Sequence, residues 1–423
     1  MNAASRRVQK VYLLLLLLHT LAASFIWGIN TLFLLDAGLS NTEAFAANAF
    51  FTAGMVICEI PTGVIADTRG RRTSYLLGTL TLAISTVLYL LMWRISAPFW
   101  AWALGSALLG LGFTFFSGAV EAWLVDALTY TGYLREGGTL EAILARGEIV
   151  EGIAMLGGSV AGGVIAQATN LGVPYILRAI VLAITFLVAF IVMRDIGFTP
   201  SPGKDPLKEV KHLLRRSIEH GLGNPPVKWV MLAGPFTGGV SIYAFYAMQP
   251  YLLQLYGDTA AYSVAGLAAA IVAGAQIAGG LLVPYLGRVI RRRTSVLLAG
   301  TALSTLALVG IGLSGFWMAV VLLGFMEFDV FGAHARASGI PEWAHRFQRA
   351  RDRAVVRLAD GIGGRGRRPA GAWQGCGRME LSGLLHLQRR DPGAGPSVPL
   401  AGAARARRYR CDFLAASVSV RAC

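Results

Sequence analysis

The sequence predicts an all-helical integral membrane protein with about ten transmembrane helices, in which a six-helix bundle is followed by an incomplete second bundle. Three observations support this fold class. Apolar stretches long enough to cross a bilayer recur from Val11 to Phe328, charged residues make up only 14% of the chain, and a basic motif of the first half returns in the second.

The composition indicates that a bilayer is the main solvent of this chain. Hydrophobic residues make up 55% of it and the mean hydropathy is +0.57, whereas soluble domains contain roughly 25% charged residues. In hydrocarbon every backbone donor and acceptor needs a partner within the protein, which only helices and closed barrels provide. The alternating pattern of a barrel is absent, so helices are predicted.

Ten apolar stretches of roughly the 20 residues needed to cross a bilayer are predicted to be membrane spans. They are 11–35, 44–66, 74–93, 98–129, 147–170, 173–193, 228–256, 260–285, 295–314 and 316–332. The first follows three basic residues, as the core of a signal peptide would, but it is too long for that role and no convincing cleavage site follows it. We interpret it as a retained first helix.

Lysines and arginines predict the orientation of the spans. They gather at the N-terminus and in every second connection, as in "TRGRR" (68–72) and "GRVIRRR" (287–293), while the opposite connections contain only Arg94. The positive-inside rule therefore places the N-terminus in the cytoplasm of a multi-pass protein of the cytoplasmic (plasma) membrane. The net charge of +15 partly reflects this topology, and no nucleic-acid partner is expected.

The chain divides into four predicted parts: a transmembrane bundle (1–193), a polar cytoplasmic connection (194–227), an incomplete second bundle (228–332) and an irregular basic tail (333–423). Aligning "RRTS" at 71–74 with "RRTS" at 292–295 places the second span on the eighth and the third on the ninth. Parallel six-helix repeats of this kind are typical of one large class of transporters.

The tail differs in character from the rest of the chain. The last 96 residues contain 17 arginines, 13 glycines and 17 alanines but no lysine, and they show neither helical nor strand periodicity. One interpretation is an Arg/Gly-rich nucleic-acid-binding segment. The interpretation we favour is a GC-rich gene read out of frame, with the last two or three spans replaced.

The motif "GVIADTRGRR" (63–72) follows the second span. Its residues Gly63, Asp67, Gly70, Arg71 and Arg72 resemble the loop between helices 2 and 3 of the major facilitator superfamily, written G-x-L-a-D-r-x-G-r-k. The resemblance covers residues 1 to about 330 and implies two six-helix halves that rock around a central site.

The same resemblance implies that this motif acts as a gate on the cytoplasmic side. Gly63 is expected to permit close helix packing and Gly70 a tight turn. We expect Asp67 to pair with arginines, and Asp126, near the cytoplasmic end of the fourth span, to pair with Arg71 or Arg69. The second half keeps the basic residues of the motif but has Arg288 where the first half has Asp67.

The fifth span contains small residues at four-residue spacing, Ala154, Gly158 and Gly162, followed by Gly163. This stretch is similar to the G-x-x-x-G-P-x-x-G-G motif of the antiporter branch of the superfamily, which implies export, although the proline is absent. Ordinary helix packing is the alternative explanation. The buried arginine that proton-coupled exporters often carry in the fourth span is also absent.

Acidic residues inside spans are costly and are therefore functional candidates. Glu59, Glu121 and Glu151 are the candidates for proton coupling, Glu121 because it lies deeper than Asp126. We expect protonation of such a carboxylate to remove a buried charge and to change which side of the protein is open. For Glu151 an ordinary structural role was equally compatible with the sequence.

Four polar or aromatic residues are candidates for lining a central cavity: Asn30, Tyr243, Tyr246 and Gln249. His19 and Asn30 could instead form helix–helix hydrogen bonds, and some of the tyrosines could form an interfacial belt. Arg178 either extends to the outer interface or acts as counter-ion to one of the acids.

The sequence therefore predicts a secondary active transporter that exports small organic molecules by alternating access, coupled to protons. The expected partners are a small-molecule substrate, the proton and the lipid bilayer, and the protein is expected to be a monomer. No enzymatic activity, cofactor or metal is expected. The alternative is a non-transporting membrane protein, either a defective transporter or a scaffold with a basic tail.

The origin of the tail can be tested by resequencing the coding DNA around codons 320–340 and translating all frames beyond that point. We expect another frame to encode two further apolar spans, because out-of-frame GC-rich codons yield Arg, Ala, Gly and Pro. If every other frame lacks such spans, the basic tail is a genuine part of the protein.

Overall fold

The computed structural model describes residues 2–116, 118–199, 210–211, 215, 223, 225–289 and 293–337, and these residues are all-helical apart from turns. The helices are α1 (Ala3–Trp27), α2 (Asn30–Asp36), α3 (Asn41–Arg69), α4 (Arg71–Arg94), α5 (Phe99–Thr114), α6 (Ala119–Tyr130), α7 (Leu140–Ala168), α8 (Gly172–Val192), α10 (Pro225–Tyr256), α11 (Tyr262–Val289), α12 (Arg293–Leu313) and α13 (Phe316–Ala337). The predicted fold class is confirmed. Most of the predicted connection (194–227) and nearly all of the predicted tail (333–423) lie outside the described residues.

Seven helical segments among the described residues are long and apolar enough to cross a membrane, and two shorter apolar stretches, Leu298–Leu313 and Phe316–Met326, follow them. The sequence predicted ten spans. Helix α10, which covers the predicted span 228–256, is not one of the seven segments found among the described residues. α12 begins at Arg293, within one residue of the position predicted from the start of α4 at Arg71.

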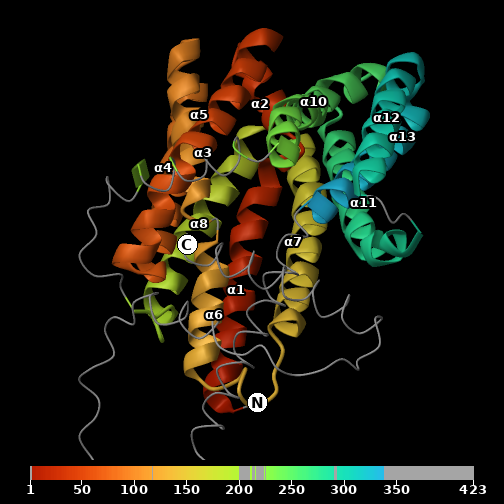
Figure 1. Cartoon of the computed structure of the whole chain (residues 1–423). Coiled ribbons are helices and arrows are strands. Elements are labelled where there is room, and N and C mark those ends of the chain that lie inside the picture. Colours follow the sequence, from red (N-terminus) through yellow and green to blue (C-terminus); the bar gives the residue numbers. More distant parts are fainter. Residues whose placement is uncertain are drawn as a thin grey trace, which may run out of the picture. The chain divides into compact units, whose positions relative to one another are not determined.

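Helix packing places α1 at the centre of the first six spans, where it contacts both α7 and α8 (Figure 1). α3 packs on α5, and α4 packs on α5 and α8. α7 also packs on α11, which in turn contacts α13. Large apolar side chains elsewhere are exposed, among them Val56 (73%), Ile153 (65%) and Trp317 (78%), as expected for helices that face lipid.

Two of the predicted spans are interrupted. The first, predicted as one helix over 11–35, is broken between α1 and α2 at Gly28 and Ile29. A Cβ at Gly28 would lie 2.8 Å from the Cβ of Ala269, so glycine allows α11 to approach the break closely. The prediction of a continuous helix is wrong here because hydrophobic length alone gives no sign of an interruption.

The fourth span, predicted as one helix over 98–129, is broken between α5 and α6. Gly118 precedes α6 with φ of +68°, in the left-handed region that favours glycine. Carbonyl groups released by the break accept hydrogen bonds from neighbouring helices: Thr62 Oγ1 donates to Thr114 O (3.2 Å) and Ser74 Oγ to Phe115 O (2.9 Å). These bonds satisfy backbone groups for which hydrocarbon offers no partner.

The small residues of the fifth span lie in α7 at two helix contacts. A Cβ added to Gly158 or Gly162 would collide with α1, with the side chain of Ser24 and the carbonyl of Phe25 respectively. Gly163 faces Gly266 of α11 in the same way, and Ala154 is buried at 4% exposure. Helix packing therefore accounts for the spacing of these residues.

Replacing Gly162 by Ala should destabilise the protein. The added methyl group would overlap the Phe25 carbonyl, which is backbone and cannot rotate away, and overpacking of this kind costs about 1–3 kcal/mol. Gly157→Ala is the matched control, because no atom lies within 4 Å of a Cβ at that position of α7. Thermal unfolding in detergent should show a lower Tm for G162A and an unchanged or higher Tm for G157A. An equal Tm for both variants would contradict this packing.

Candidate functional site

The connection between α3 and α4 turns at Gly70, which has φ of +107° and ψ of +151°. A Cβ at this position would also overlap the carboxylate of Asp195, which follows α8. Both the backbone conformation and the close approach of the acid therefore require glycine. Gly63 differs from expectation: within the part of the chain that the structure describes, no atom of a neighbouring helix lies within 4 Å of a Cβ there, so packing among these residues does not explain this glycine.

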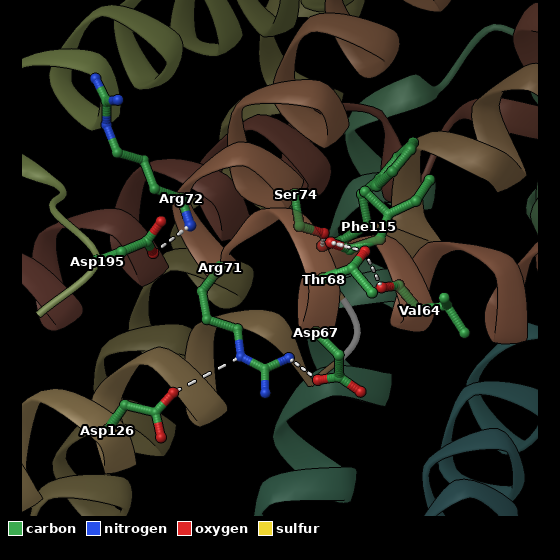
Figure 2. A network of polar contacts seen from close by, with 10 residues as sticks. Val64, Asp67, Thr68, Arg71, Arg72, Ser74, Phe115, Asp126 and Asp195 are labelled. Carbon is green, nitrogen blue, oxygen red and sulfur yellow. Dashed lines mark hydrogen bonds and ion pairs between the residues drawn. The ribbon is translucent and has the colours of Figure 1, made fainter. Parts of the chain in front are cut away.

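Arg71 connects two acids near the start of α4, as Figure 2 shows. Its Nη1 lies 2.5 Å from Asp67 Oδ1 of α3, and its Nε lies 3.8 Å from Asp126 Oδ2 of α6. The arginine side chain is 18% exposed, compared with 57% for Asp67 and 34% for Asp126. Asp126 thus pairs with Arg71, one of the two partners considered from the sequence.

Arg72 joins the same region to the end of α8. Its backbone N–H donates to Asp195 Oδ1 at 2.8 Å (Figure 2). Its Nη2 donates to the carbonyl of Phe190 (2.7 Å). The guanidinium also lies 5.1 Å from the ring centre of Phe190. An acid at the N-terminus of α4 and a cation at the C-terminus of α8 both match the helix dipoles.

Asp195 is a member of this network that the sequence reading did not single out. A signal for it exists, because it is an acid directly after the sixth span, on the side where the arginines of the motif gather. The network formed by Asp67, Arg71, Arg72, Asp126 and Asp195, here called the Arg71 network, joins α3, α4 and α6 to the segment after α8.

A cavity of about 190 Å³ lies among helices of both halves of the chain. Its polar and aromatic lining residues come from α1, α2, α3, α4, α5, α8 and α10. Its aliphatic lining residues are Ala23, Ile26, Leu109 and Met155. The polar and aromatic residues are Trp27, Asn30, Asn48, Phe51, Tyr89, Phe113, Arg178 and Tyr246. Two of the four predicted cavity residues, Asn30 and Tyr246, line it.

The other two predicted cavity residues lie elsewhere. Gln249 is buried at the break between α1 and α2, where its Oε1 accepts from the N–H of Thr31 (2.9 Å) and its Nε2 donates to Trp27 O (3.1 Å). It thereby replaces helical partners that the break removes. Tyr243 is 57% exposed and contacts the ring of Phe45, at 5.4 Å between ring centres, so the expectation that it lines the cavity is wrong for this structure.

Polar side chains on one side of the cavity form a chain of hydrogen bonds. Tyr175 Oη donates to Asn30 Oδ1 (2.9 Å), and Asn30 Nδ2 donates to Asn48 Oδ1 (2.9 Å). Asn48 is only 5% exposed, and its Nδ2 is a buried donor without a partner in the part of the chain that the structure describes. Buried amide groups are normally satisfied, so this donor needs an explanation.

Arg178 is a buried cation in the wall of the cavity, with 2% exposure. Its Nε donates to Thr86 Oγ1 (3.1 Å), its Nη1 donates to Ala22 O (3.3 Å), and its guanidinium carbon lies 5.9 Å from the ring centre of Phe113. It is neither extended toward the outer interface nor paired with an acid of the described residues. Both sequence interpretations of Arg178 are therefore wrong.

The proton-coupling candidates lie outside the cavity lining. Glu121 is in the first turn of α6 and Glu151 is in α7, and the charges of Glu121 and Glu148 act on Glu151. The charges of Glu121, Glu148 and Glu151 also act on the hydroxyl of Tyr12 in α1. Glu59 and Glu121 are exposed rather than buried, whereas Glu151 is half-buried, so the expected buried charge fits Glu151 best.

Comparison with known proteins decides the family. The family model described as Major Facilitator Superfamily matches residues 12–340. This chain belongs to the major facilitator superfamily. Members of the family transport solutes, and this chain has the fold of these secondary transporters. No curated protein sequence matches it at a significant level.

Solved structures of superfamily transporters share this fold at low sequence identity. The nucleoside transporter NupG superposes with a TM-score of 0.62 at 11% identity, covering 81% of this chain and 82% of NupG. The POT family transporter PepTSo gives 0.52 at 12% identity, covering 78% and 81%. The human organic anion transporter MFSD10 gives 0.50 at 17% identity, covering 78% and 84%. At these identities the likeness shows the fold alone.

The bond from Asp195 to the N-terminus of α4 should contribute to stability. Asp195→Ala removes the acceptor for the Arg72 N–H, and loss of a helix N-terminal acceptor costs about 1 kcal/mol. Asp195→Asn keeps an acceptor oxygen and should recover a large part of this loss. Differential scanning fluorimetry in detergent should rank the Tm values as wild type, then D195N, then D195A. An unchanged Tm for D195A would show that the contact contributes nothing.

Proposed function

We propose that this superfamily member is a proton-coupled transporter that exports small organic molecules across the cytoplasmic membrane. In this proposal it works as a monomer with its N-terminus in the cytoplasm, in keeping with the arrangement of positive charge along the sequence. No metal or cofactor takes part.

The observation that carries the proposal is the cavity shared by the two halves. Asn30 and Arg178 belong to the first half, and Tyr246 belongs to α10 of the second. Alternating access requires a binding site between the repeats, so that rocking one half against the other exposes the same site to each side in turn. A site built within one half would not be exposed in this way.

The Arg71 network supports a gating role close to the end of α3 and the start of α4, on the side that we propose is cytoplasmic. Arg71 is shared between Asp67 and Asp126, and the 3.8 Å separation from Asp126 is longer than that from Asp67. We propose that this weaker contact breaks when the cytoplasmic side opens. Its partial exposure makes it inexpensive to break.

Proton coupling is assigned to Glu151, with Glu121 and Glu148 as neighbours. Protonation of Glu151 would remove a negative charge on which the like charges of Glu121 and Glu148 act. Because α7 contacts both α1 and α11, a change in its charge acts at a contact between the halves. The direction of transport, export, is proposed from the resemblance of the small residues of α7 to the antiporter motif, although these residues also serve helix packing.

Replacing Glu151 by Gln should separate binding from proton coupling. Everted vesicles containing the full chain first establish a pH gradient, and a pH-sensitive dye reports its dissipation. The solutes are then added one at a time: benzoate, succinate, uridine, glycylsarcosine and ethidium. At least one solute should dissipate the gradient through the wild type. Glu151→Gln should reduce that rate at least tenfold but retain solute counterflow, because a neutral side chain mimics the protonated state.

Glu141→Gln is the matched control for this experiment, since Glu141 is an exposed acid in the first turn of the same helix. It should behave as the wild type does. Equal proton-coupled rates in E151Q and the wild type would remove Glu151 from the mechanism, and solute flux without any proton movement would refute coupling altogether.

A further inference from the structure

The cavity contains positive charge without a matching acid. Arg178 is buried in its wall, and the charged and polar neighbours that act on the guanidinium are tyrosines, Tyr175 and Tyr89, rather than carboxylates of the described residues. Burying a cation without a counter-ion is energetically costly. Ionisable residues placed in this way within the membrane are commonly part of a ligand or ion pathway.

Two residues of the cavity wall, Arg178 and Asn48, keep unused hydrogen-bond donors. Arginine carries five N–H donors and no acceptor, and the described contacts of Arg178 use Nε and Nη1 for two of them. Asn48 contributes an Nδ2 that has no partner among the described residues, while its Oδ1 accepts from Asn30. Unused donors beside a cation match a ligand group that is both an acceptor and negatively charged.

The remaining walls are apolar and aromatic. Phe51 and Phe113 stand in the lining with Trp27, Leu109 and Ile26, and rings of this kind bury the apolar part of a ligand. A volume of about 190 Å³ suits a small molecule rather than a long peptide. The lining formed by the described residues includes neither Asp nor Glu, so a cationic ligand would find no counter-charge among them.

From these observations we infer that the cavity binds a small organic monocarboxylate, with its carboxylate between Arg178 and Asn48 and its apolar body against Phe51 and Phe113. The inference rests on the proposed transport function but names the substrate class, which the family and the neighbouring structures leave open. Export of such an anion is also favoured by the inside-negative potential of a cytoplasmic membrane.

Binding to the full chain in nanodiscs tests the inference through a set of matched ligands. Benzoate, benzamide and benzylamine have the same ring and carry an anionic, a neutral and a cationic group, and the fluorescence of Trp27 in the lining offers a readout alongside calorimetry. We expect benzoate to bind at least tenfold more tightly than benzamide, and benzylamine not to bind. Inorganic phosphate should compete poorly, because it lacks an apolar body.

Variants of the two donors locate the site. Arg178→Gln should weaken benzoate binding at least tenfold and leave the weak benzamide binding unchanged, whereas the exposed Arg135→Gln should bind as the wild type does. Arg178→Lys should recover part of the affinity, since lysine keeps the charge but not the forked geometry. If Arg178→Gln fails to fold, Asn48→Ala provides the same comparison, with a several-fold loss confined to benzoate.

Several results would overturn the inference: equal affinities for the three matched ligands, equal competition by phosphate, absence of benzoate binding, or unchanged benzoate binding in both donor variants. The proposed function fails separately. If benzoate binds but no solute crosses the vesicle membrane, the carboxylate site stands and the transport proposal fails. If a neutral solute crosses but no carboxylate binds, the transport proposal stands and the carboxylate site fails.

Discussion

Every backbone polar group released inside a membrane protein has to find a partner within the protein, and this constraint organises both regions described above. The chain interrupts two of its membrane helices. At the first interruption Gln249 binds the freed groups of Trp27 and Thr31, and at the second Thr62 and Ser74 bind the freed carbonyls of Thr114 and Phe115. Each interruption is thus tolerated because side chains from other helices complete it.

One interruption lies at the cavity and the other lies beside the Arg71 network. The break between α1 and α2 sets Trp27 and Asn30 into the cavity wall, and the residue that satisfies it comes from α10 of the other half. The break between α5 and α6 is tied to the start of α4, immediately beside Arg71 and Arg72. A continuous helix at either place would direct these residues differently, because side-chain direction follows helical phase.

The sequence predicted the fold class well because lipid imposes a strong and simple signal, a run of apolar residues. It also predicted the residues around Gly70, since a glycine, an acid and adjacent arginines at one membrane boundary form a local pattern. The interruptions were missed because the partners that permit them are distant in sequence. Gln249 lies 222 residues from Trp27, while Thr62 and Ser74 lie 52 and 41 residues from the carbonyls to which they donate. Arg178 was misinterpreted for the same reason: a helix end close to an interface predicts exposure, whereas burial results from the surrounding helices α1, α4 and α5.

Negative charge gathers on α6 and α7, whereas the cavity wall carries the positive charge of Arg178. The charges of Glu121 and Glu148 act on Glu151, and all three acids act on Tyr12, while Arg178 in the cavity wall has no acidic partner among the described residues. A negatively charged ligand would complete the charge balance of the cavity and stabilise whichever arrangement of the halves closes around Arg178. Protonation of the acids would act through α7, which packs on both α1 and α11. Ligand and proton would then influence the same contact between the halves from different places, which is the condition for coupling their movements without a direct contact between them.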